Sequence, residues 1–127
     1  MYLPDTNILI RAFGNSETED SFLKEATIKN ELAISVVVIT EFLSGIRNNQ
    51  EVKKDFFKLL DQLRIIGINR EVAEIAGEYR KESLKTNKAY LADCFLAAQA
   101  KKYNLTIVTN NTTDFPMKDI KVMKPKR

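Results

Sequence analysis

The stretch AYLADCFLAAQA, residues 89–100, constrains the fold more than any other part of the chain. Leu91, Cys94, Phe95 and Ala98 recur at helical spacing, and further apolar residues fill most of the remaining circumference. A helix that is apolar nearly all round has to be covered on most sides by other elements. Asp93 is its only charged residue, and a buried carboxylate is costly unless a cation, a hydrogen-bond donor or a metal compensates it.

The remainder of the chain alternates between short β-branched runs and amphipathic helical patterns. Strands are predicted at residues 1–4, 32–35, 65–68, 106–109 and 120–123. Between them, helical spacing predicts helices within residues 8–13, 17–29, 36–47, 51–63 and 70–81. Ser35, Asn69 and a Ser16–Glu19 capping box would start three of these helices, although a strand continuing to Ile39 competes with the helix at 36. The pattern predicts a single α/β domain over residues 1–127, a three-layer α/β/α sandwich with a mostly parallel sheet of about five strands.

Missing residue types exclude several classes of site. With 127 residues, no histidine and one cysteine, the chain cannot build an imidazole-based triad, a histidine metal site or a CxxC pair. No apolar run is long enough to span a bilayer, and the N-terminus lacks a signal pattern, so we expect a cytoplasmic protein that does not bind membranes. The twenty Lys and Arg residues against seventeen acids would suit a polyanionic partner only if they segregate on the surface.

Four acids stand out as candidate site residues. Asp5 follows the first predicted strand and Asp114 lies just past the fourth, so both belong at the carboxyl edge of the sheet, where α/β proteins place their sites. Glu41, like Asp93, interrupts an apolar segment, and the same burial argument applies to it. Taken alone, Asp5 also suits a helix cap and Asp114 a turn. Converging carboxylates would favour Mg²⁺ or Mn²⁺, and with them phosphodiester hydrolysis.

At these four acids the sequence resembles the PIN-domain ribonucleases, most closely the VapC-like toxins of prokaryotic toxin–antitoxin modules. The family's motifs correspond to DTNILI at Asp5, ITEFLSG at Glu41, LADCFLAA at Asp93 and TNNTTDF at Asp114. The resemblance implies a Mg²⁺- or Mn²⁺-dependent endoribonuclease acting on RNA, a homodimer, and inhibition by a cognate antitoxin protein. Thr109 and Asn111 also match polar residues that support the site in this family. We expect Thr6, next to Asp5, to support the site together with them.

Two positions depart from the family pattern. Pro4 replaces the usual aliphatic residue before the first aspartate, and its missing N–H puts the pairing of the first strand in question. Asn110 stands where relatives often carry a basic residue or serine, which bears on substrate contacts.

Other functions remain open from the sequence alone. A phosphoacceptor receiver domain would need an acidic partner for Asp5 and an aspartate after the strand at 65, where Asn69 stands. A haloacid-dehalogenase-like phosphatase would need an aspartate at Asn7. A catalytically idle PIN-like module for RNA binding or protein interaction is the remaining alternative, and the presence of all four acids argues against it.

Overall fold

Five short parallel strands form the centre of the molecule. The computed structural model describes residues 1–86 and 89–126 and contains strands β1 (Tyr2–Pro4), β2 (Ala33–Ser35), β3 (Arg64–Ile66), β4 (Thr106–Val108) and β5 (Lys121–Met123). Strand β1 pairs with β4, β4 with β5, and β2 with β3, all in parallel. A parallel bridge from Tyr2 to Leu32 joins the two sets in the order β3-β2-β1-β4-β5. The mostly parallel sheet of about five strands is confirmed.

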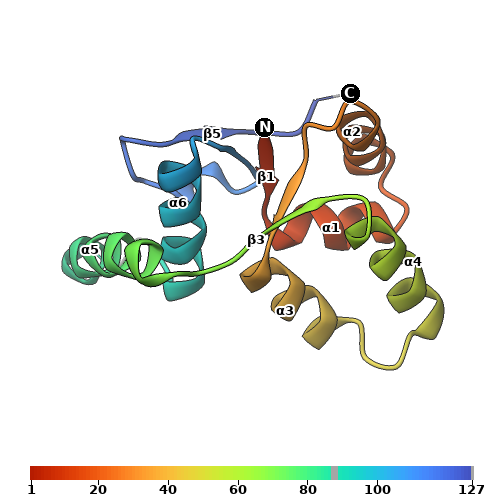
Figure 1. Cartoon of the computed structure of the whole chain (residues 1–127), viewed down its shortest axis with the longest axis horizontal. Coiled ribbons are helices and arrows are strands. Elements are labelled where there is room, and N and C mark those ends of the chain that lie inside the picture. Colours follow the sequence, from red (N-terminus) through yellow and green to blue (C-terminus); the bar gives the residue numbers. More distant parts are fainter. Residues whose placement is uncertain (87–88, 127) are drawn as a thin grey trace.

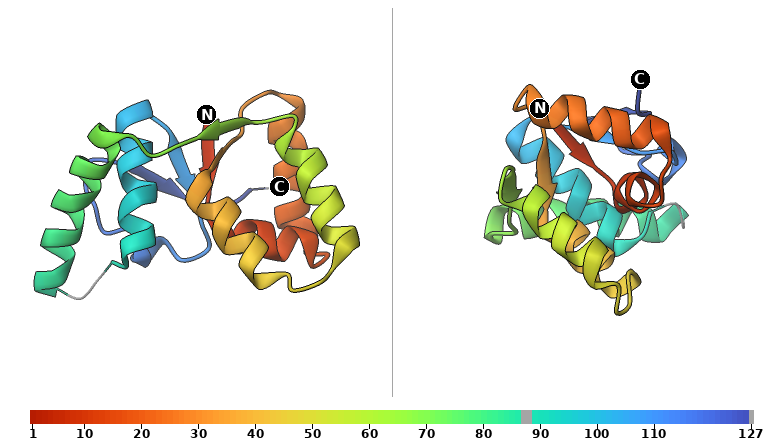
Figure 2. Two further views of the ribbon diagram at one scale, coloured as in Figure 1. Left: turned by 60° about the horizontal axis from the view of Figure 1, so that its bottom comes forward. Right: turned by 90° about the vertical axis from the view of Figure 1, so that its right-hand side faces the viewer.

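Helices pack on both sides of these strands. Figure 1 shows α5 and α6 on one side, with the remaining four α-helices gathered on the other, and Figure 2 repeats this separation from two further directions. No helix within the described ranges is long and apolar enough to cross a bilayer. The three-layer α/β/α prediction is therefore confirmed, with helices at α1 (Thr6–Phe13), α2 (Glu17–Ile28), α3 (Val36–Gly45), α4 (Gln50–Leu60), α5 (Arg70–Thr86) and α6 (Leu91–Tyr103), and a 3₁₀ turn η1 (Thr112–Asp114).

Helix α6 lies between the sheet and α5, as its apolar circumference predicts. Leu96, Ala97 and Ala100 are buried in the main core, whereas Cys94 and Ala98 are buried in a second cluster with residues of α5. The helix begins at Leu91 rather than Ala89 and continues one turn beyond Ala100. It ends where Asn104 adopts the left-handed conformation, with φ 53°.

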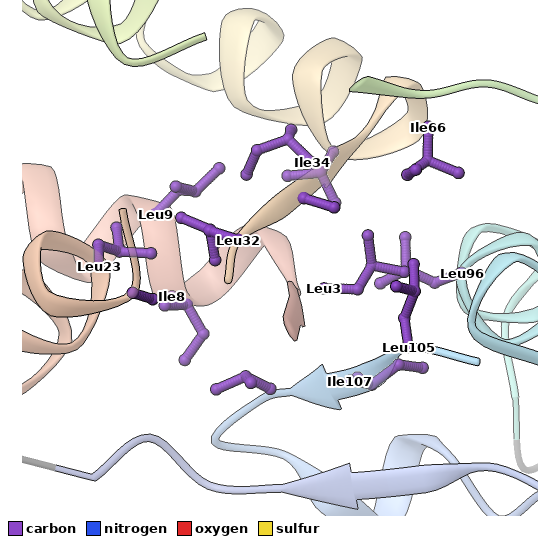
Figure 3. Close-up of a cluster of buried hydrophobic side chains, with 14 of the residues drawn as sticks. Leu3, Ile8, Leu9, Leu23, Leu32, Ile34, Ile66, Leu96, Leu105 and Ile107 are labelled. Carbon is purple, nitrogen blue, oxygen red and sulfur yellow. The ribbon is translucent and has the colours of Figure 1, made fainter. Parts of the chain in front are cut away.

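The main core joins strand residues to the apolar faces of the first helices. Figure 3 shows Leu3 and Ile107, from adjacent strands, close to Leu96 of α6, with Ile8 and Leu9 of α1 farther along the same cluster. All five side chains are at most 2% exposed. Packing of this kind holds the first turns of α1 and α6 rigidly against the sheet, and both turns carry predicted site residues.

Local capping decides most of the boundaries. The Ser35 Oγ atom accepts a hydrogen bond from the Val37 N–H at 3.1 Å and starts α3, so the alternative of a strand continuing to Ile39 is wrong. The predicted caps at Asn69 and Ser16 differ in outcome, since Asn69 accepts from the Val72 N–H but Ser16 accepts from no helix N–H. The Ser16 capping box is therefore wrong.

Candidate functional site

The four predicted acids line one open pocket of about 440 Å³. Asp5 follows β1, Glu41 lies in α3 directly after β2, and Asp114 lies in η1 after β4. Asp93 comes from the first turn of α6. Strand order changes direction between β1 and β4, so the pocket lies at the carboxyl-end crevice where an α/β sheet provides its binding site. The other residues that line it are Thr6, Asn7, Ile10, Ser44, Tyr90 and Ala92.

Asp5 is both a helix cap and a member of the acidic pocket. Its Oδ1 atom accepts a hydrogen bond from the Thr6 N–H at 2.7 Å, and its Oδ2 atom accepts one from the Thr109 hydroxyl at 3.0 Å. Pro4 does not disturb the strand, because it stays in register with Val108 and the Asp5 N–H donates to the Val108 carbonyl at 2.9 Å. Burial raises the pKa of Asp5 despite these donors, and the Glu41 and Asp114 charges raise it further.

Glu41 reaches the pocket from an exposed position. Its side chain accepts a 2.6 Å hydrogen bond from the Thr6 hydroxyl, which also confirms that Thr6 contacts the acids. The burial argument for Glu41 is wrong, however, since the residue is exposed. It lies at the edge of the buried face of α3, one turn after Val38 and directly before Phe42, which are both buried. The apolar run around it reflects the hydrophobic content of α3 and carries no information about burial of the acid.

Asp93 is the most perturbed carboxylate of the pocket. Burial raises its pKa from 3.8 to about 7, with further contributions from the negative charges of Asp5, Asp114 and Glu41. Within residues 1–86 and 89–126, no Lys or Arg lines the pocket to offset this charge. Asp93 therefore lies among like charges, which is consistent with the prediction that it needs a compensating partner. Near neutral pH, a fraction of the molecules carry a proton on Asp93.

The turn after β4 connects Asp114 to the same network. Thr109 is fully buried, and its hydroxyl oxygen accepts a 3.0 Å hydrogen bond from the Asn111 N–H while the hydroxyl donates to Asp5. The Asn111 carbonyl accepts from the Asp114 N–H at 3.0 Å and starts η1. Asn111 thus contributes to the site through its backbone, and its exposed side chain does not cap the turn.

Glu19 is a buried acid that we did not include among the candidate site residues. Its carboxylate is 3% exposed and accepts hydrogen bonds from Ser16 Oγ at 2.7 Å, Arg11 Nε at 2.6 Å and Asn110 Nδ2 at 3.2 Å. The hydrogen bond from Ser16 has the largest effect on the pKa of Glu19. Together with the bonds from Arg11 and Asn110, it lowers this pKa to about 2 although burial opposes the change. Glu19 thereby connects α1 and α2 to the residue that follows Thr109. The sequence contains a signal for it, because Glu19 shares a helical stripe with Phe22, the apolar residue three positions on.

The donor chemistry of the pocket fits a hard divalent cation. Its lining contains four carboxylates, which are the ligands that Mg²⁺ and Mn²⁺ prefer. Within the described ranges, however, no three Asp, Glu or Cys side chains are gathered closely enough to form a ready-made metal cluster. The carboxylates instead stand around an open pocket, as like charges without a counterion repel one another.

Comparisons with known proteins agree with this architecture. Ribonuclease VapC10 of Mycobacterium tuberculosis is 29% identical over 118 residues, which cover 92% of this chain and 87% of that protein. Ribonuclease VapC2 of Rickettsia felis is 29% identical over 123 residues, covering 91% and 90%. The crystal structure of VapBC2 from Rickettsia felis, bound to a promoter DNA fragment, superposes with a TM-score of 0.83 at 23% identity over 98% of both chains. The PIN domain family model matches residues 2–120, so the chain belongs to the PIN domain family.

Proposed function

We propose that this chain is a Mg²⁺- or Mn²⁺-dependent endoribonuclease and the toxin of a toxin–antitoxin pair. The observation that carries the proposal is the convergence of Asp5, Glu41, Asp93 and Asp114 on one pocket at the carboxyl ends of β1, β2 and β4. The relatives described as VapC ribonucleases support RNA as the substrate. By the same analogy, we propose one nuclease domain over residues 1–127, a homodimer, a cognate antitoxin protein as partner, and the cytoplasm as its location.

The four acids would hold the cation, and their neighbours would orient them. A bound Mg²⁺ or Mn²⁺ would supply Lewis acidity and a water activated for attack on a phosphodiester. Thr109 holds one oxygen of Asp5 and the Thr6 N–H holds the other, while the Thr6 hydroxyl holds Glu41. Asp93, whose pKa is about 7, can carry a proton in the pocket near neutral pH.

An RNA cleavage assay tests the function directly. Protein freed from any co-purified antitoxin is incubated with RNA and Mg²⁺ or Mn²⁺, and wild type is compared with Asp93→Asn. We expect metal-dependent cleavage by wild type, no cleavage in EDTA, and a loss of at least roughly 100-fold in Asp93→Asn, the size typical of a removed charge-stabilising group. Asp55→Asn is the matched control, because it makes the same change in charge at an exposed position of α4.

Two outcomes would contradict the proposal. Equal cleavage by wild type and Asp93→Asn would show that the pocket does not perform the reaction. Absence of cleavage by antitoxin-free wild type with either metal would favour the alternative of a catalytically idle PIN domain that binds RNA or another protein.

A further inference from the structure

The acidic pocket has an apolar rim that its metal chemistry does not explain. Ile10 of α1 and Tyr90, the residue that precedes α6, both line the pocket. They are 49% and 74% exposed, so each presents a large apolar surface to solvent beside the carboxylates. Exposed apolar side chains are common when scattered singly, but two on one pocket indicate a surface that contacts a ligand.

The fold uses the backbone of Tyr90 but not its ring. Its carbonyl accepts the Cys94 N–H at 3.0 Å, and its extended conformation starts α6. Its side chain makes no capping hydrogen bond, although helix N-caps favour residues whose side chains do. The ring packs in neither hydrophobic cluster, in contrast to those of Tyr79 and Tyr103. Structural requirements at this position would therefore be met better by serine or aspartate than by tyrosine.

Charge cannot supply the affinity for a nucleic acid inside this pocket. Among the residues that the structure describes, the lining contains four carboxylates and no Lys or Arg, so its walls repel a phosphate backbone until a cation is bound. An unstacked nucleobase, in contrast, gains affinity from any exposed aromatic face, whatever the charge nearby. Tyr90 is the aromatic residue among those that line the pocket, and it lies three residues before Asp93.

We propose that Tyr90 stacks on the base of a nucleotide next to the scissile phosphate and so helps to position the RNA strand. This inference rests on the proposed nuclease function. Stacking needs an unpaired base, and the base next to a phosphate held at Asp93 is the part of the substrate within reach of the rim. Ile10 of α1 lines the same pocket and provides a second apolar surface there.

Steady-state kinetics of Tyr90→Ala test the contact. Base stacking on one aromatic residue corresponds to about 5- to 150-fold in affinity, so we expect KM for RNA to rise by that factor with little change in kcat. Tyr90→Phe keeps the ring and is expected to restore KM to within about twofold of wild type, because stacking uses the ring face. Leu91→Ala is the matched control, because Leu91 is the next residue, is 52% exposed and does not line the pocket.

Abasic substitution in the RNA identifies the base. Nucleotides on either side of the mapped cleavage site are replaced one at a time by an abasic ribose. One replacement is expected to raise the KM of wild type by the same factor as Tyr90→Ala and to have no further effect on that variant. If the two effects multiply instead, the ring and the base act independently and the stacking contact is overturned.

The remaining outcomes separate this inference from the proposed function. If wild type cleaves RNA and Tyr90→Ala has an unchanged KM, the nuclease function stands and the stacking contact is wrong. If the variant also changes its sedimentation behaviour, the exposed ring belongs to a contact between copies of the chain. If wild type neither binds nor cleaves RNA, the nuclease function fails and the stacking contact fails with it.

Discussion

Replacing Asp93 with asparagine is expected to make the metal-free protein more stable at pH 8. The pKa of Asp93 is about 7 in the folded chain and 3.8 as the reference for the unfolded chain. Between these values the folded state binds more protons than the unfolded state, so stability falls as pH rises from about 4 to 7. Above pH 7 the penalty is complete, and Asp93→Asn removes it because the amide carries no charge.

The size of the effect follows from the shift in pKa. Three pKa units correspond to about 4 kcal/mol of differential interaction. Asp93 is partly exposed, and solvent screening reduces this figure, so we expect the variant to gain about 2 kcal/mol. For a chain of this length, such a gain corresponds to roughly 1 M in the urea midpoint. Below about pH 3, wild type and variant should unfold at nearly the same midpoint, since Asp93 is then mostly protonated in both states of wild type.

Urea unfolding in EDTA at pH 8 and at about pH 3 measures both quantities. Asp55→Asn again serves as control, since it changes net charge equally at an exposed position of α4 and should shift the midpoint little at either pH. An Asp93→Asn midpoint equal to or below that of wild type at pH 8 would refute the reasoning, because burial and the neighbouring carboxylates would then not destabilise ionised Asp93 in the folded chain.

Other predictions concern the remaining acids. Glu19→Gln keeps the shape of the side chain but places an amide among three donors, so we expect a loss of about 2 to 3 kcal/mol near pH 7, measured by urea unfolding. Because the pKa of Glu19 is about 2 in the folded chain, the extra stability of wild type over Glu19→Gln is lost as pH falls from 4.5 toward 2. A stability difference that persists at pH 2 would show that the ionised carboxylate is not its cause. Mn²⁺ at 100 times its Kd should stabilise wild type by about 2.7 kcal/mol, measured as a rise in melting temperature, and Asp5→Asn should blunt the rise. An equal rise in both proteins would place the ion elsewhere.

The sequence predicts the layers and the position of the pocket because both follow from local patterns. Alternating short strands and amphipathic helices determine a parallel sheet, and an acid directly after a strand must lie at the carboxyl edge, as Asp5 does. Helix ends were less predictable. Helix α6 begins at Leu91, two residues after the predicted Ala89, because Tyr90 before it lacks the usual capping side chain.

Glu41 shows where pattern reasoning fails. An acid in an apolar run was expected to be buried, yet the apolar residues of α3 are buried or partly buried while Glu41 is exposed beside them, as are Thr40, Ser44 and Gly45. Its position in the pocket comes from the packing of α3 against α1 and from the Thr6 hydroxyl, neither of which its own segment encodes. Glu41 lines the pocket with the other three acids, although the physical reason offered for selecting it was wrong.

Glu19 and Asp93 carry the same signal in the sequence and have opposite electrostatics in the fold. Each is an acid on a helix face that is otherwise apolar. Glu19 meets Ser16, Arg11 and Asn110, all donors, and its pKa falls to about 2. Asp93 is partly buried beside three more carboxylates, and its pKa rises to about 7. An acid whose partners are supplied by the chain stabilises the fold, whereas one left among like charges destabilises it until a cation binds. Of the two, only Asp93 has the property expected of a site that needs a ligand.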